Sequence, residues 1–135
     1  MQVAEAWVKQ ADEKLRVIVH VGHNCLIDAQ ELTRHAAKIG ASAASAFAPC
    51  FFKPRDNDEL VDWCRKLAGA APGLPFYYYN IPSMTGVNLK VAPFLAKARR
   101  SDPEPRRCEV HLRRSRGLSG LRELRGRSLR HLVWP

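Results

Sequence analysis

Apolar and polar positions along the first hundred residues follow two periods, one typical of helices and one typical of strands. In segment 2–14, Val3, Trp7 and Val8 fall on one stripe with charged residues opposite, which predicts an amphipathic helix. Segment 16–22 is almost continuously apolar and rich in β-branched residues. This pattern predicts a strand that is covered on both faces, as strands of a parallel sheet are.

The same alternation of strand and helix continues beyond residue 22. We expect Asp28 to cap a helix that ends at Gly40, where glycine accepts the left-handed conformation of a helix stop. A strand follows at 44–48, although its run of alanine and serine has poor strand propensity and would underfill a barrel core. The next helix opens at Asp56, with acidic residues at the positive end of its dipole.

A short aromatic run at 77–79 predicts the third strand, because aromatic residues suit a packed, pleated surface. Pro82 lacks an amide hydrogen and ends that strand, so Tyr79 lies at its C-terminal tip. A short helix at 90–97 completes the pattern. Strands and helices that alternate through short loops predict an α/β fold with a parallel sheet, in one domain of residues 1–96.

Residues 97–135 differ in character from the rest of the chain. They carry 12 Lys and Arg against 4 Asp and Glu, so most of the net charge of +9 lies there. Pairs of arginines recur among Ser, Pro and Gly with little apolar periodicity, and we therefore expect a basic tail of low order.

Composition excludes several classes of protein. The four cysteines form no Cys-x-x-Cys pair, so neither a zinc site nor a disulfide framework is expected. No apolar run approaches the ~20 residues of a membrane span, and charged residues interrupt any apolar core near the N-terminus. These features favour a cytoplasmic protein without a bound metal.

One motif carries a specific resemblance. The run Tyr-Asn-Ile-Pro-Ser-Met-Thr-Gly-Val at 79–87 resembles the Tyr-Asn-Ile-Pro-x-x-(Ser/Thr)-Gly-Val motif of N-acetylneuraminate lyases, which are class I, Schiff-base aldolases of the dihydrodipicolinate synthase superfamily. Further segments resemble vertebrate members of that family in the same order, namely 2–8, 17–22, 29–32, 35–40 and 48–49. The likeness covers residues 2–96, and the tail does not share it.

The resemblance implies a fold and a reaction. The fold would be a partial (β/α)8 TIM barrel of about three parallel strand–helix units, because a complete barrel needs about 250 residues and this chain has 135. The reaction would be retro-aldol cleavage of N-acetylneuraminate (sialic acid) to N-acetylmannosamine and pyruvate, through an imine on a lysine. The family works in sialic acid degradation, in the cytoplasm, as a homotetramer and without a cofactor.

The same resemblance assigns roles to three residues. Tyr79 matches the family tyrosine that helps to move the proton and contacts the pyruvate-derived part of the substrate, which makes it the expected catalytic residue. Met84 and Thr85 fall in the loop beside the substrate pocket and are expected to bind substrate. Phe51 and Phe52 stand where some relatives of the superfamily carry tyrosines.

Two other parts of the family site have no counterpart in this sequence. The family lysine comes from the strand after the tyrosine strand, in a Gly-Leu-Lys-like context, whereas the last lysine here is Lys97. Lys90 and Lys97 fall in the loop and helix after Tyr79, where we expect solvated surface groups. The Gly-Thr-Thr-Gly-Glu-like loop that holds the substrate carboxylate is also missing, so we expect this chain alone to be inactive.

Two other functions remain open from sequence. The chain could be a non-catalytic interaction protein that binds full-length lyase subunits. It could also bind nucleic acid through its arginines, a weaker reading because Trp134 is the only aromatic residue in the tail. Among the remaining polar residues, we expect His20 to be a core histidine inside a strand, and His23 and Asn24 to lie in the loop that follows it.

Overall fold

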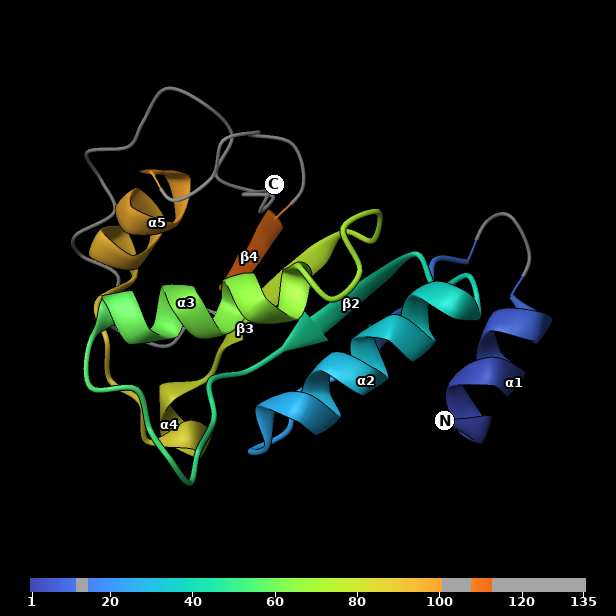
Figure 1. Cartoon of the computed structure of the whole chain (residues 1–135), viewed down its shortest axis with the longest axis horizontal. Coiled ribbons are helices and arrows are strands. Elements are labelled where there is room, and N and C mark those ends of the chain that lie inside the picture. The colour runs from blue at the N-terminus through green and yellow to red at the C-terminus, as the bar shows by residue number, and fades with distance from the viewer. Residues whose placement is uncertain (12–14, 101–107, 113–135) are drawn as a thin grey trace.

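A single parallel sheet organises the protein (Figure 1). The computed structural model describes residues 1–11 and 15–100 in full and the backbone of 108–112. Its strands are β1 (Ile18–His20), β2 (Ala43–Ala46), β3 (Phe76–Asn80) and β4 (Cys108–Leu112), and they lie side by side in chain order. Every neighbouring pair is parallel, which confirms the predicted class of fold.

The helices that connect these strands cover one face of the sheet. They are α2 (Leu26–Lys38), α3 (Asn57–Ala68) and α5 (Val91–Arg100), with a single turn, α4 (Pro82–Thr85), directly after β3. Figure 1 shows α2 and α3 side by side in front of the strands. Because each connection between parallel strands has the same right-handed sense, successive helices fall on the same side. The opposite face of the sheet carries no helix among the described residues.

The core lies between the helices and the sheet. Its largest fully buried side chains are Phe76 from β3, Phe94 from α5, and Leu60 and Leu67 from α3. The alanines of β2 are also buried, and this strand forms in spite of its poor propensity. It lies between β1 and β3 and is hydrogen-bonded to both, so pairing outweighs the weak preference of alanine and serine.

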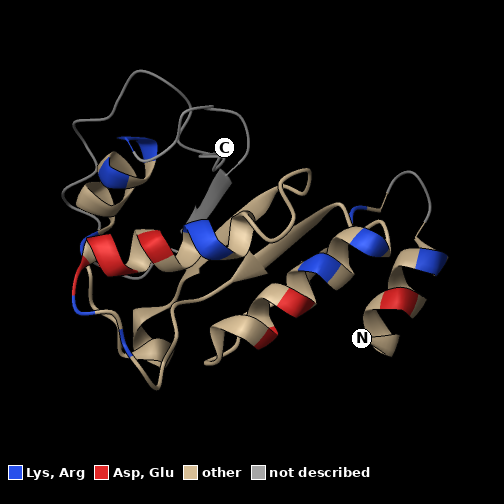
Figure 2. Cartoon of the chain, in the orientation of Figure 1, with Lys and Arg blue, Asp and Glu red and all other residues tan. Residues whose placement is uncertain are grey.

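Helix α3 begins where the sequence predicts. The Asp56 carboxylate accepts hydrogen bonds from the backbone N–H groups of Asp58 and Glu59, both at 2.9 Å. These hydrogen bonds, chiefly the one from Glu59, lower the pKa of Asp56. Figure 2 shows acidic residues toward the start of both α2 and α3 and basic residues toward their ends, an arrangement that suits the helix dipole.

Two local predictions need correction, the cap of α2 and the length of β1. Helix α2 begins after Cys25, so Asp28 lies in its first turn and does not cap it. Strand β1 spans only Ile18–His20. The first helix, α1 (Gln2–Gln10), buries none of its residues, and Trp7 on its apolar stripe is 60% exposed. The expected continuation of this helix over 12–14 lies outside the described residues.

The sheet also has one strand more than the three predicted. Strand β4 comes from the segment that we expected to have low order, and its residues pair with β3 from Phe76↔Cys108 to Asn80↔Leu112. Its five residues alternate apolar and polar, but they lie between arginine pairs that hid this short pattern. The other predictions about residues 101–107 and 113–135 lie outside the described residues.

Candidate active site

The carboxyl ends of β1, β2 and β3 bring three loops to one edge of the sheet. In parallel α/β folds this edge is where ligand sites are built. The loop after β1 is joined to the loop after β2 by Asn24. Its side-chain oxygen accepts hydrogen bonds from the backbone N–H groups of Cys50 and Phe51, both at 3.1 Å. The sequence predicted that Asn24 lies in the loop after β1, at this edge of the sheet. In the structure its side chain links that loop to the loop after β2.

His23, the neighbour of Asn24, fixes the start of α2. Its Nδ1 atom accepts a hydrogen bond from the backbone N–H of Cys25 at 3.1 Å. The Asp28 carboxylate lies 3.3 Å from the same atom. Because the His23 Nδ1 atom already accepts this hydrogen bond, we interpret its proximity to the Asp28 carboxylate as a packing contact and not as an ion pair.

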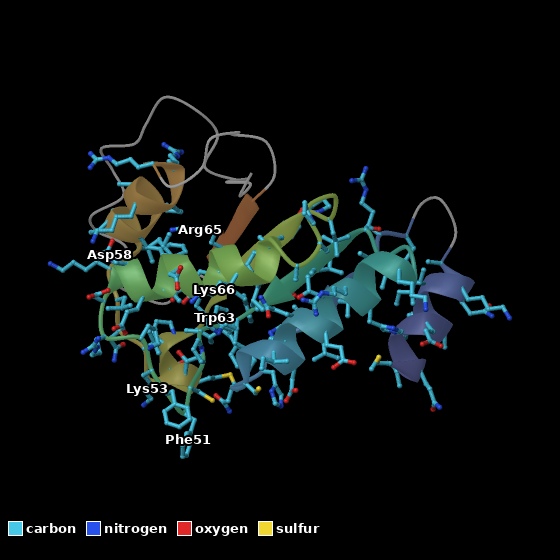
Figure 3. The ribbon with its side chains drawn as sticks, in the orientation of Figure 1. Phe51, Lys53, Asp58, Trp63, Arg65 and Lys66 are labelled. Atoms are coloured by element: carbon cyan, nitrogen blue, oxygen red, sulfur yellow. The ribbon has the colours of Figure 1, made fainter. Side chains whose placement is uncertain are left out.

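The loop after β2 reaches the loop after β3 through Lys53. A Cβ atom at Gly86 would lie 2.6 Å from the Lys53 Nζ atom, so the amine rests against the main chain of Gly86. In Figure 3, Lys53 lies close to α4, and Phe51 lies beyond it at the tip of its loop. Phe51 and Phe52 meet edge to face with ring centroids 4.9 Å apart, and each is 75% exposed. Lys53 is a residue that the motif-based prediction overlooked.

The predicted substrate-binding residues Met84 and Thr85 lie in very different surroundings. Met84 is 79% exposed, whereas Thr85 is buried. The Thr85 hydroxyl donates to the carbonyl of Ile81 at 3.1 Å and accepts from the N–H of Val87 at 3.3 Å. The Thr85 side chain therefore stabilises the turn after β3. Of the two residues, only Met84 has a side chain that is exposed to solvent.

Tyr79 lies near the C-terminal end of β3 and is half-buried. Its neighbour Tyr78 is buried against Phe94 of α5, and burial raises the Tyr78 pKa. Side chains alternate between the two faces of a strand. Tyr77 and Tyr79 therefore lie on the helix-free face, which would line the interior of a closed barrel.

His20 belongs to the same face. It is the register partner of Ser45, which in turn is the partner of Tyr77. The sequence predicted a core histidine, but His20 is exposed, because among the described residues β1 is at the edge of the sheet and no helix covers this face. The imidazole stacks on Phe47 with ring centroids 4.7 Å apart, and partial burial lowers its pKa.

The lysines that follow Tyr79 lie in the loop and the helix after β3, as predicted, and not on a strand. Lys97, on α5, forms an ion pair with Asp58 at the start of α3. Lys90 is exposed just before α5. Strand β4 lies directly beside β3, and its sequence Cys-Glu-Val-His-Leu contains no lysine. An imine-forming amine is therefore not supplied by the strand next to Tyr79.

The described residues contain no group of three or more His, Cys, Asp or Glu side chains that could hold a metal ion. Cys25 and Cys50 are free and exposed, and Cys64 is free and buried. Burial raises the pKa of the Cys64 thiol, which keeps it protonated and unreactive. In the part of the chain that the structure describes, no helix combines the length and the apolar character needed to cross a membrane.

Known proteins resemble this chain over the same region. The sequence model of the dihydrodipicolinate synthetase family matches residues 1–98. N-acetylneuraminate lyase of Gallus gallus is 50% identical over 103 residues, which are 76% of this chain and 33% of that protein. The lyase of Rattus norvegicus is 50% identical over 95 residues, 70% of this chain and 30% of that protein.

Solved structures agree with the sequence matches. N-acetylneuraminate lyase (sialic acid aldolase) from Aliivibrio salmonicida matches with a TM-score of 0.71 and 45% identity, over 76% of this chain and 34% of that one. The N-acetylneuraminate lyase of Proteus mirabilis matches with a TM-score of 0.69 and 40% identity, over 73% and 33%. The chain thus spans about a third of the length of these relatives.

Proposed function

Because this chain belongs to the dihydrodipicolinate synthetase family, we propose that its residues 1–98 form one wall of an N-acetylneuraminate lyase site. The proposed substrate class is sialic acid, with pyruvate as one product of the cleavage. Sequence identity of 50% to curated lyases supports this choice within the family. The single observation that carries it is Tyr79, which lies one residue before the end of a parallel strand, on the helix-free face, and begins the lyase motif.

Tyr79 is the catalytic residue of this proposal. A phenol moves a proton effectively only when its partners hold the proton in place. Hydrogen bonds of Asn24 and Thr85 hold the loops that follow β1, β2 and β3. These bonds fix the positions of the loops at the sheet edge near Tyr79. Met84 would contact substrate through its exposed side chain, and Thr85 would act mainly by holding the turn.

The chain by itself would not cleave sialic acid. Imine formation needs a lysine amine beside the tyrosine, and β4, the strand next to Tyr79, carries none. Lys53 approaches the loop after β3 but rests against Gly86 in an exposed position. We therefore expect no release of pyruvate from sialic acid by the 135-residue chain. The cytoplasmic location and the homotetramer implied by the resemblance stay predictions.

A chimera tests the role of Tyr79. Residues 1–98 would replace the matching third of the Gallus gallus lyase, which supplies the rest of the barrel, and lyase activity would be measured. We expect Tyr79→Phe to lower kcat by about 100-fold or more, which is the usual contribution of a positioned proton donor. Tyr77→Phe, on the same face two residues earlier, is the matched control. Equal effects of the two substitutions would contradict the assignment.

A further inference from the structure

His20 is a titratable residue that the proposed reaction does not use. It lies in β1 opposite Ser45 of β2, which is in turn the register partner of Tyr77 in β3. The next residue of β1, Val21, is fully buried in the core under the helices. Because side chains alternate along a strand, His20 lies on the other face of the sheet, which it shares with Tyr79. In a (β/α)8 barrel this face lines the interior.

Gly22 leaves room for the imidazole of His20. A Cβ atom at residue 22 would lie 2.6 Å from the ring Cε1 atom and 3.2 Å from the ring Nε2 atom. It would also lie 3.3 Å from the backbone nitrogen of Phe47. Residue 22 follows His20 by two positions and therefore lies on the same face, nearer to the carboxyl end of the strand. The ring thus leans forward, toward the loops of the candidate site.

Phe47 holds the imidazole in this position. The ring centroids of His20 and Phe47 are 4.7 Å apart, and their planes are inclined at 30°. Phe47 and Tyr79 are the residues that come one step beyond the register pair Ala46↔Tyr78. Strand β2 lies between β1 and β3, so His20 and Tyr79 are two strand spacings apart, about 10 Å, with Phe47 between them.

The charge state of His20 limits what it can bind. Partial burial lowers its pKa, so the imidazole is uncharged at neutral pH. Any further cover on this face would increase the burial and act in the same direction. A neutral imidazole has one donor and one acceptor nitrogen. These suit a hydroxyl group, which also donates and accepts, better than a carboxylate, which only accepts and is bound most strongly by charged donors.

We propose that His20 binds a hydroxyl group of the sugar part of sialic acid, while Tyr79 takes the pyruvate-derived part. This inference rests on the proposed function, because it adds a residue to the same site. A substrate held at Tyr79 by one end extends its hydroxyl-bearing part away from that strand. Phe47 offers this part an apolar surface, and His20 beyond it supplies a polar contact, the usual combination in a ligand site.

Nuclear Overhauser spectroscopy of the full 135-residue chain tests the position of the imidazole. We expect contacts between the ring protons of His20 and Phe47. Gly22→Ala should weaken these contacts, because the added Cβ pushes the imidazole aside. Gly73→Ala is the control, since a Cβ at that position meets no atom within 4 Å. A contact that is absent, or that survives Gly22→Ala unchanged, would overturn the inference.

Ligand affinity tests the role of the imidazole, in the chimera with the Gallus gallus lyase that is described above. Calorimetric titrations would use N-acetylmannosamine, which has hydroxyl groups and no carboxylate, and separately pyruvate, which has a carboxylate and no hydroxyl. His20→Phe keeps a ring against Phe47 but removes both nitrogens. It should weaken the binding of N-acetylmannosamine by about tenfold, as expected for one lost hydrogen bond, and leave pyruvate binding unchanged.

Two further variants complete this experiment. Gly22→Ala keeps the imidazole but displaces it, so it should also weaken the binding of N-acetylmannosamine, and it still tests the inference if His20→Phe prevents folding. Tyr77→Phe is the matched control, because it removes a polar atom from the same face, and it should leave both affinities unchanged.

The outcomes separate this inference from the proposed function. A chimera that binds N-acetylmannosamine through His20 but does not cleave sialic acid would contradict the proposed function alone. A chimera that cleaves sialic acid with the same KM before and after His20→Phe would contradict this inference alone. The inference would also be overturned by a chimera that binds no N-acetylmannosamine, by an equal loss in Tyr77→Phe, or by a loss confined to pyruvate.

Discussion

The ring of Tyr78 packs against the ring of Phe94, with centroids 4.9 Å apart and planes inclined at 46°. This contact joins β3 to α5 and fixes which face of the strand is covered. Because neighbouring side chains on a strand point to opposite faces, it also sets Tyr79 on the helix-free side. The orientation of the candidate catalytic residue thus follows from the packing of the residue before it.

Replacement of Tyr78 should therefore cost far more stability than replacement of Tyr79. Tyr78 is 4% exposed, and Tyr78→Ala should lower the free energy of unfolding by about 3 kcal/mol through the cavity that it leaves. Tyr79→Ala should cost less than about 1 kcal/mol, because its side chain is only half-buried. Urea unfolding followed by circular dichroism measures both, and similar losses would contradict the assignment of the two faces.

Gly86 should be sensitive to the addition of a methyl group. Its φ is +67°, in the left-handed region, and Gly86→Ala should destabilise the protein by about 1 kcal/mol. The Lys53 amine would also have to move, although the end of a flexible side chain does so easily. Gly73→Ala is the control, because a Cβ there meets no atom within 4 Å and φ is not positive. Thermal melts compare the two variants, and we expect only the first to lower the melting temperature.

Asn24 should control the order of the loop after β2. Asn24→Ala removes the oxygen that accepts the N–H groups of Cys50 and Phe51. These two amides should then exchange with solvent faster, by about tenfold if one net hydrogen bond is lost. Hydrogen–deuterium exchange of a peptide spanning residues 50–51 is the measurement. Asn88→Ala, in the exposed loop before α5, should leave this exchange unchanged.

The cap of α3 should make stability depend on pH. Backbone hydrogen bonds lower the pKa of Asp56 in the folded protein, so folding favours the charged carboxylate. The resulting stability is fully present above the unfolded pKa of about 4 and is lost as pH falls through the lower, folded pKa. Asp56→Asn keeps a capping side chain without a charge. Its stability should fall less between neutral pH and about pH 3, measured by urea unfolding, and an unchanged slope would contradict the assignment.

The sequence predicts the helices and the strands that they cover well, because the spacing of apolar residues shows which side of a helix is buried against the sheet. Leu60, Cys64 and Leu67 recur at helical spacing and are all buried. The short strand β4 could not be predicted in this way, since five alternating residues between arginines carry a weak signal and parallel pairing with β3 depends on contacts distant in sequence.

The same limit applies to the site. The lyase motif locates Tyr79, but periodicity cannot tell which residues of an edge strand face a helix layer, so His20 was placed in the core. Thr85 shows a related difficulty. Its place in the motif suggests a contact with substrate, whereas its hydroxyl forms hydrogen bonds with the backbone of Ile81 and Val87, a structural role that the motif alone does not indicate.

Reductive trapping tests the central claim most directly. The chain would be incubated with pyruvate and borohydride, which converts an imine on lysine into a stable adduct, and its mass would be measured intact. The account predicts an unmodified chain, because no lysine lies on the strand beside Tyr79. A stoichiometric adduct on Lys53, Lys90 or Lys97, accompanied by release of pyruvate from sialic acid, would contradict it.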